Sequence, residues 1–271
     1  MNTLERKMVE VLKDLRDNHH VVGIKAEFEA EGTRLEEAMR LKEVISRAGL
    51  GLTLKVGGCE ALRDIYEART IGVERIVAPM VETPFALSKF LKAVDLAFPA
   101  DEQQDVQFAV NIETLTAYRA FKDMLAVPEA AKLGGIVVGR VDLTGSMGLG
   151  RGEVNSKVVF DITADLLGQG RAAGLEVAVG GGVSAESLPW LRELPLGGVE
   201  RFETRKVIFG CPGALGAQGD KGILKAVGFE LLWLKNKRDY YGLIFEEDHN
   251  RIDMLERRYR DMIEQAGGIY G

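Results

Sequence analysis

Two acidic residues follow neighbouring apolar segments of the chain, and their placement gives the first indication of chemistry. Residues 135–138 are predicted to form a buried strand, and Arg140 and Asp142 come directly after it. Alternation along an extended chain would aim both side chains at one face. The preceding predicted strand, residues 106–112, ends beside Glu113. Two carboxylates at neighbouring strand ends can hold a hard cation such as Mg²⁺ and leave coordination positions for substrate oxygens, whereas the alternative is an ion-pair network.

The predicted strand at residues 21–29 carries three charged side chains on one face, namely Lys25, Glu27 and Glu29. Glu27 or Glu29 could act as a general acid or base, because burial can raise the pKa of a carboxyl group towards neutrality. The alternative is a layer of paired charges that closes the interior. The pattern does not distinguish between the two glutamates.

Lys55 ends the predicted strand at residues 51–56 and admits three roles. Its ammonium group could stabilise an enolate. It could instead form a Schiff base if burial lowered its pKa, and Lys25 is open to the same role. The third possibility is an internal salt bridge to Glu82 or Glu113.

Glycines and one arginine near later strand ends are candidates for binding an anion. Gly181 and Gly182 follow a predicted strand at residues 175–179, and their bare amides could hold a phosphate or carboxylate, although a tight turn is the alternative. Residues 201–209 are predicted to form one strand, with Arg201, Glu203 and Arg205 on one face and Phe202, Thr204 and Lys206 on the other. Either face places a cation inside, so Arg205 is a candidate for substrate binding.

Strands and helices alternate along most of the chain, which predicts parallel strands with helices outside. Charged residues at the strand ends favour a TIM (β/α)₈-type barrel, while a doubly wound sheet is weaker because the first turn lacks GxGxxG. Seven strands are identified, so one is degenerate or the barrel is incomplete. The barrel domain is predicted at residues 1–220 and a C-terminal helical extension at 221–271. That extension carries two apolar stripes and is interpreted as a lid, a brace or a subunit interface.

Composition excludes several classes of protein. A net charge of −6 gives no basic footprint for nucleic acid, and no apolar run reaches the length that spans a bilayer. The three histidines lack zinc-ligand spacing. The N-terminal segment is charged and amphipathic, unlike a signal peptide, and the two cysteines form no CxxC, so we expect a cytoplasmic protein.

Three segments together resemble the HpcH/HpaI aldolase and citrate lyase β-subunit family across about residues 20–210. Residues 77–83 read Val-Ala-Pro-Met-Val-Glu-Thr, residues 111–114 read Asn-Ile-Glu-Thr, and residues 139–148 read Gly-Arg-Val-Asp-Leu-Thr-Gly-Ser-Met-Gly. The last is similar to the family's Gly-x-x-Asp-Leu-x-x-Ser-Met-Gly. The order and the spacing of the three make the resemblance specific.

The resemblance implies a barrel that binds phosphoenolpyruvate or pyruvate, with Mg²⁺ or Mn²⁺ as cofactor. It also implies chemistry at a carbon–carbon bond next to a 2-oxo acid or an acyl thioester. Glu113 and Asp142 match the family's metal ligands, and Lys55 stands where an arginine usually contacts the enolate oxygen. Glu82 and Gly139 lie in the matching segments and are expected to line the substrate site. The chain departs from the family in lacking its base histidine near Glu27.

The first prediction is therefore a metal-dependent carbon–carbon lyase that acts on a small anionic substrate. Lys55 or Arg140 would assist, and Glu27 or Glu29 would move the proton. The alternatives are a Schiff-base lysine aldolase and a barrel that binds phosphoenolpyruvate or another acid without turnover. A homo-oligomer is expected, with no nucleic-acid or membrane partner.

Overall fold

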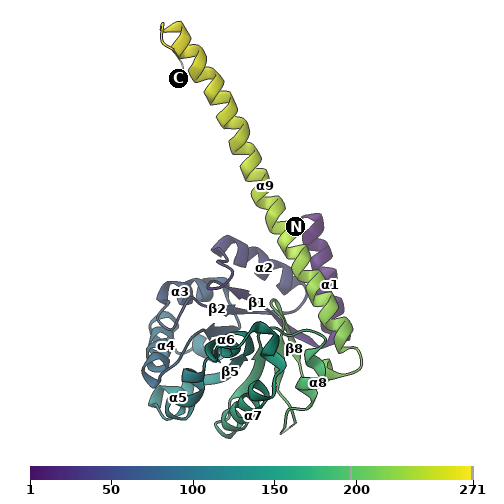
Figure 1. The fold of residues 1–271 in the computed structure, drawn as a ribbon. Coiled ribbons are helices and arrows are strands. Elements are labelled where there is room, and N and C mark those ends of the chain that lie inside the picture. The colour runs from purple at the N-terminus through teal and green to yellow at the C-terminus, as the bar shows by residue number, and fades with distance from the viewer. Residues whose placement is uncertain (196, 270–271) are drawn as a thin grey trace.

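The computed structural model describes residues 1–195 and 197–269, and its centre is a closed barrel of eight strands (Figure 1). The predicted TIM-type barrel is confirmed. Strands β1 to β7 pair in parallel with their neighbours, whereas β8 is antiparallel to both β7 and β1. The strands are β1 (Val21–Glu27), β2 (Gly51–Lys55), β3 (Arg75–Ala78), β4 (Gln107–Ile112), β5 (Leu133–Gly139), β6 (Glu176–Gly180), β7 (Arg201–Glu203) and β8 (Val207–Gly210).

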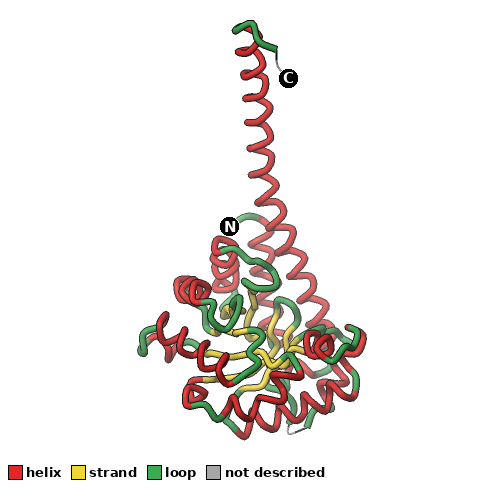
Figure 2. Tube along the Cα trace, turned by 60° about the vertical axis from the view of Figure 1, so that its left-hand side comes forward, coloured by secondary structure: helices red, strands yellow, loops and turns green. Residues whose placement is uncertain are grey.

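Helices surround the strands on the outside, as the tube view shows (Figure 2). Local signals start several of them. At α4, Thr83 accepts a hydrogen bond from the Ala86 amide (3.1 Å) and Pro84 takes the first helical position. The α-helices are α1 (Thr3–His19), α2 (Leu35–Arg47), α3 (Leu62–Ile71), α4 (Pro84–Ala97), α5 (Leu115–Leu125), α6 (Arg140–Ser146), α7 (Lys157–Ala172), α8 (Ser187–Arg192) and α9 (Gly219–Gln265). Short 3₁₀ helices are η1 (Glu102–Asp105), η2 (Pro128–Lys132), η3 (Arg151–Asn155) and η4 (Gly213–Leu215).

Alternation along each strand divides its side chains between two environments. Large apolar residues such as Ile24, Leu52 and Ile76 point outward into one continuous core shared with the helices. Small residues of the opposite face meet inside the barrel; they are Val77, Ala109, Val137 and Ala178. The helices therefore hold the barrel from outside, and its interior is left to small and charged side chains.

The predicted single strand at residues 201–209 is wrong, because the segment folds back on itself. Glu203 pairs with Ile208 across an antiparallel hairpin, and the Thr204 amide donates to the Val207 carbonyl (2.9 Å). This hairpin supplies the eighth strand, so the barrel closes without a degenerate or missing strand.

The C-terminal extension is one long helix, α9, that packs against α1 and then projects away from the barrel (Figure 1). Its buried side consists of residues such as Ile223, Ala226, Phe229 and Trp233. The predicted first stripe, which comprised Ile223, Val227, Leu231 and Leu234, shares only Ile223 with this buried set, because the other three are exposed. Within the described residues, no helix combines the length and the apolar character that crossing a membrane requires.

Candidate functional site

Glu113 follows β4 at the carboxyl-terminal end of the barrel, and three neighbours fix its side chain. It is almost fully buried. The Met80 amide donates to its Oε1 (3.0 Å), and Asn111 Nδ2 donates to its Oε2 (2.8 Å). Met80 is held at a φ of +51°, which is uncommon for a residue with a side chain. A Cβ at Gly139 would lie 2.6 Å from Oε2, so only glycine leaves room for this carboxylate. These three neighbours therefore fix the orientation of the carboxylate.

The electrostatic balance at Glu113 disfavours its charged form. Burial raises the pKa of the Glu113 carboxyl, and the nearby charge of Asp142 raises it further. The Lys55 ammonium, the Met80 amide and Asn111 lower the pKa without cancelling that rise. Asp142 is exposed in the first turn of α6. The two predicted metal-ligand carboxylates thus lie near enough to repel each other, and a cation between them would relieve that repulsion.

A buried chain of alternating charges runs up the inside of the barrel from β1 to the mouth. Lys25 Nζ lies 3.0 Å from Glu27 Oε1 and 3.3 Å from Glu203 Oε1. Burial opposes the charge of Lys25, but the carboxylates of Glu203 and Glu27 outweigh burial and raise its pKa. Lys55 Nζ contacts Glu29 Oε2 at 3.1 Å.

The charges of Glu27 and Lys55 are set by the same chain. Burial favours the neutral acid of Glu27, yet Lys25 and Lys55 lower its pKa, so Glu27 is an ionised carboxylate and a weak base. Burial likewise acts against the Lys55 ammonium, while Glu113, Glu27 and Glu29 raise its pKa. Both lysines are therefore cations near neutral pH, unlike a Schiff-base nucleophile, which requires a lowered pKa.

The loop between β1 and α2, residues 28–34, lies over this charge chain and is held by ion pairs. Glu29 reaches Lys55, and Glu31 contacts both Lys206 and Arg205, the latter at 3.3 Å. The Glu29 side chain remains one-third exposed, at 33%. Of the two candidate glutamates, Glu29 is the one that combines contact with Lys55 and access to solvent.

Arg140 does not face the site, because α6 begins at this residue and replaces the predicted extended chain. Successive helical residues are about 100° apart, so Arg140 and Asp142 lie on different sides of α6. Arg140 is fully buried, donates to the Gly180 carbonyl (3.2 Å) and to Asn155 Oδ1 (2.7 Å), and stacks on Trp190 with 4.7 Å between its Cζ and the ring centre. Burial lowers the pKa of this guanidinium to about 10. Its contacts are those of a residue that fixes η3 and the β6–α8 connection to the start of α6.

The remaining predicted substrate-site residues divide into two groups. Glu82 accepts a hydrogen bond from Thr114 Oγ1 (2.6 Å), directly beside Glu113. Gly181 and Gly182 have φ values of +75° and +67°, and a Cβ at Gly181 would lie 2.6 Å from the Val141 amide nitrogen. These residues border the barrel mouth.

Arg205 is placed differently, in the turn between β7 and β8. Its side chain is 51% exposed and contacts Glu31 and Glu230 rather than the barrel interior. The prediction that Arg205 shares the interior with the other candidates is therefore wrong, because the chain reverses at this point. Lys206 of the same turn is the buried cation, and burial lowers its pKa despite Glu31.

Three residues of the site were not singled out by sequence reasoning. Asn111 orients Glu113, the Met80 amide does the same, and Glu203 is the second partner of Lys25. Asn111 stands two residues before Glu113, on the same face of β4, so alternation could have identified it. The positive φ of Met80 had no signal in residue type.

The donor set fits a hard divalent cation only if water and substrate complete the coordination. In the part of the chain that the structure describes, no group of three or more His, Cys, Asp and Glu side chains is arranged to hold a metal ion. Two carboxylates remain, and each oxygen of Glu113 keeps a free lone pair beyond its one hydrogen bond. Mg²⁺ is commonly bound by one or two carboxylates together with waters and substrate oxygens.

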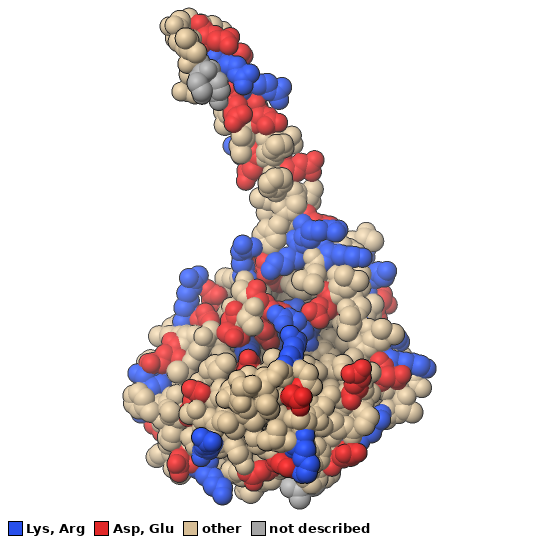
Figure 3. Space-filling model, viewed as in Figure 1, with Lys and Arg blue, Asp and Glu red and all other residues tan. Residues whose placement is uncertain are grey.

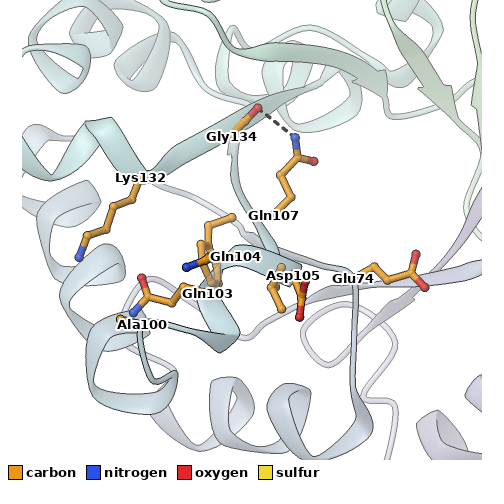
Figure 4. Close-up of a pocket in the computed structure, with 10 residues that line it drawn as sticks. Glu74, Ala100, Gln103, Gln104, Asp105, Gln107, Lys132 and Gly134 are labelled. Atoms are coloured by element: carbon orange, nitrogen blue, oxygen red, sulfur yellow. Dashed lines mark hydrogen bonds between the residues drawn. The ribbon is translucent and has the colours of Figure 1, made fainter.

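A cavity of about 570 Å³ lies at the opposite end of the barrel (Figure 4). It is bordered by Glu74, Lys132 and Gln107, and Gln107 Nε2 donates to the Gly134 carbonyl at 3.1 Å. These residues stand at the amino-terminal ends of β3 to β5. Just inside the same end, Arg201 and Arg75 pair with Glu176. This layer separates the cavity from the carboxylates at the mouth.

Comparison with known proteins gives one family. Residues 54–184 match the family model described as HpcH/HpaI aldolase/citrate lyase. An HpcH/HpaI aldolase/citrate lyase family protein from Burkholderia cenocepacia J2315 is 17% identical, with a TM-score of 0.55 over 72% of this chain and 92% of that one. The citrate synthase SbnG is 16% identical, with a TM-score of 0.58 over 86% and 90%. An HpcH/HpaI aldolase from Desulfitobacterium hafniense DCB-2 is 15% identical, with 0.58 over 81% and 88%. No curated protein matches this chain.

The matching family consists of aldolases and citrate lyases, which make or break carbon–carbon bonds. The predicted class of enzyme, a carbon–carbon lyase, is therefore confirmed at the level of the family. At these identities the solved structures show the shared barrel and nothing finer.

Proposed function

We propose that this chain is a carbon–carbon lyase that uses a divalent cation and acts on a small 2-oxo acid or a related anion. The predicted resemblance to the HpcH/HpaI aldolase/citrate lyase family is confirmed by the family match, and it supports this proposal. The observation that carries the proposal is the Glu113 carboxylate, buried at the barrel mouth, oriented by two hydrogen bonds and raised in pKa beside Asp142. A buried carboxylate whose charged form is disfavoured, and which has no direct ion pair among the described residues, is typical of a functional site and here fits one that takes up a cation.

Glu113 and Asp142 would hold Mg²⁺ or Mn²⁺. The cation would supply a Lewis acid that polarises a carbonyl oxygen and offsets negative charge as it develops. Gly139 contributes by leaving space for the Glu113 carboxylate. Asn111 contributes by fixing which way that carboxylate faces.

Lys55 is suited to the oxygen that gains charge when a bond next to a carbonyl breaks. Its raised pKa keeps it an ammonium group, so it can donate to an enolate oxygen without first taking up a proton. Glu27 pairs with Lys25, and its charge also acts on Lys55 and helps to keep that side chain an ammonium group. Glu29 touches Lys55 from the partly exposed loop, and we assign it the transfer of the proton.

A Schiff-base mechanism is disfavoured by the same charges. Lys25 and Lys55 both have raised pKa values, so the neutral amine that attacks a carbonyl is scarce near pH 7. Binding of an acid without turnover remains the alternative that experiment has to separate.

The decisive experiment follows exchange of the pyruvate methyl protons for deuterium by nuclear magnetic resonance. We expect exchange that a chelator abolishes and that added Mg²⁺ or Mn²⁺ restores. Glu113→Gln should slow the exchange about 100-fold or more, the scale seen when a preorganised electrostatic group is removed.

The matched control is Glu10→Gln, which removes an exposed carboxylate on α1 that contacts Lys13. It should exchange at the rate of the unaltered chain. Unchanged exchange in Glu113→Gln would refute the metal role. Borohydride trapping of pyruvate on Lys25 or Lys55 would establish the Schiff-base alternative. Pyruvate binding without exchange under any metal would establish a non-catalytic barrel.

A further inference from the structure

The outward side of α9 carries an apolar stripe along almost the whole helix. Its members, which we call the outer stripe, lie outside the buried side of α9, and each is more than half exposed. They are Leu224, Val227, Leu231, Leu234, Phe245, Ile252, Leu255 and Met262. An apolar surface of this length on a projecting helix marks an interaction site. Figure 3 shows the projecting rod with tan surface between its charged groups.

The side of α9 that packs on the body is a different one. Ile223, Ala226, Phe229 and Trp233 are buried there. Contacts with α2 extend to Tyr241, whose hydroxyl donates to Glu37 Oε1 (2.6 Å). Beyond this point the helix stands clear of the barrel (Figure 1). Most helical stability in proteins comes from packing of an apolar face, so we expect the apolar side of the projecting part to pack on a partner.

The outer stripe has the spacing of a coiled coil. Its residues follow one another at alternating steps of three and four, which is the a and d pattern of a heptad repeat. Tyr241 and Tyr259 occupy two further positions of this pattern, and at Tyr241 the seam borders α2, because its hydroxyl is bonded to Glu37. The remaining two positions are charged: Arg238 at an a position and Asp248 at a d position.

We propose that the outer stripe binds the outer stripe of a second copy of this chain, with the two α9 helices antiparallel. The two charged positions decide the orientation. Arg238 and Asp248 lie equally far from residue 243 on either side. In an antiparallel pair centred there, Arg238 of one copy faces Asp248 of the other, and the symmetry axis makes this contact twice.

The same register matches the apolar positions. Ile252 faces Leu234 of the other copy, and Leu255 faces its Leu231. Residues 224–241 carry more basic than acidic side chains, whereas residues 245–262 carry more acidic than basic ones. An antiparallel pair therefore places the basic half of each helix along the acidic half of its partner.

A parallel pair fails on the same two positions. It would set Arg238 against Arg238 and Asp248 against Asp248 inside the seam, and like charges that face each other at an interface repel. The outer stripe is therefore complementary to the outer stripe of a second copy, because the opposite charges of Arg238 and Asp248 lie symmetrically about its centre. The inference does not depend on the proposed lyase activity.

The test is a charge exchange in the full chain, read by sedimentation equilibrium. Arg238→Asp alone places two acids opposite each other, and Asp248→Arg alone places two bases opposite each other. We expect each single variant to weaken the dimer at least about 10-fold. The double variant R238D/D248R restores opposite charges in the antiparallel pair and should recover the original affinity.

Arg257→Asp and Asp253→Arg make the same charge changes on α9 at positions outside the heptad seam, and they should leave the dimer unchanged. Circular dichroism reports whether each variant keeps its helix. A chain that stays monomeric at micromolar concentrations would overturn the proposal. So would a double variant no better than the single ones, since that result indicates a parallel pair or a different partner.

Discussion

Replacing Lys25 by methionine tests the buried charge chain of the barrel directly. The substitution keeps the length of the side chain and removes its ammonium group. Glu203 and Glu27, with Oε1 atoms 3.3 Å and 3.0 Å from Lys25 Nζ and side chains only 8% exposed, then lose a cation. Removing one partner of a buried ion pair costs about 3–5 kcal/mol, because the other charge stays buried. We expect the free energy of unfolding to fall by that amount at about pH 7.5.

The loss should depend on pH in one direction. In the unaltered chain Lys25 and Lys55 hold the pKa of Glu27 below its ordinary value of 4.5 against the effect of burial, so the ionised pair stabilises the fold above that value and is lost as the pH falls through the lowered pKa. Without Lys25, the effect of burial on Glu27 is opposed by fewer positive charges, so the pKa of Glu27 rises. The folded variant can then bind a proton, so its deficit should shrink between about pH 7.5 and about pH 5.

Urea unfolding at both pH values measures the effect, and Lys13→Met is the control. Lys13 contacts Glu10 at 3.1 Å on the surface, where both side chains are well exposed. Its loss should change stability by no more than about 0.5 kcal/mol. A deficit below about 1 kcal/mol for Lys25→Met, or one that is equal at the two pH values, would refute the view of Lys25 as the buried counter-ion.

Three shorter predictions concern the mouth and its support. Gly139→Ala would place a Cβ 2.6 Å from Glu113 Oε2, so it should abolish metal binding, measured by calorimetry, and with it the proton exchange. The control Gly145→Ala has open space around the new Cβ and should bind metal normally, and equal affinities of the two variants would contradict the close packing at Gly139. Because the pKa of Glu113 is raised, Mg²⁺ affinity should fall as the pH is lowered from about 8 to about 5, and affinity independent of pH would exclude Glu113 as a ligand. Arg140→Lys should lower stability by about 2–3 kcal/mol, since an ammonium cannot replace the bond to Asn155 and the stacking together, and a thermal midpoint unchanged from that of the original chain would argue against this structural role.

The barrel was predictable because its signals are local and repeated. Each strand is an apolar run followed by a polar end, and caps such as Thr83 mark where helices start. Alternation placed Lys25 and Glu27 on the inner face of β1, and the structure pairs them there. These features depend on residue type and near neighbours, which the sequence records directly.

The errors came from chain reversals and early helix starts that residue type does not announce. The turn between β7 and β8 consists of Arg205 and Lys206, without the glycine or asparagine that usually marks a tight hairpin. Arg140 begins a helix with no capping side chain before it, so strand alternation was carried too far. The position of Glu203 beside Lys25 depends on the closure of the whole barrel.

The reversal of β8 has a consequence for everything that follows it in the chain. The Gly210 amide donates to the His20 carbonyl (2.8 Å) at the amino-terminal rim, so the last helix starts from the floor of the barrel. It then climbs beside α1 and passes the start of α2, where Lys237 contacts Glu37 at 3.0 Å. A parallel eighth strand would have sent that helix downward, out of the floor. In this structure the helix instead runs past the carboxyl-terminal end of the barrel. A partner bound to its projecting part would therefore lie on the same side of the barrel as Glu113 and Lys55.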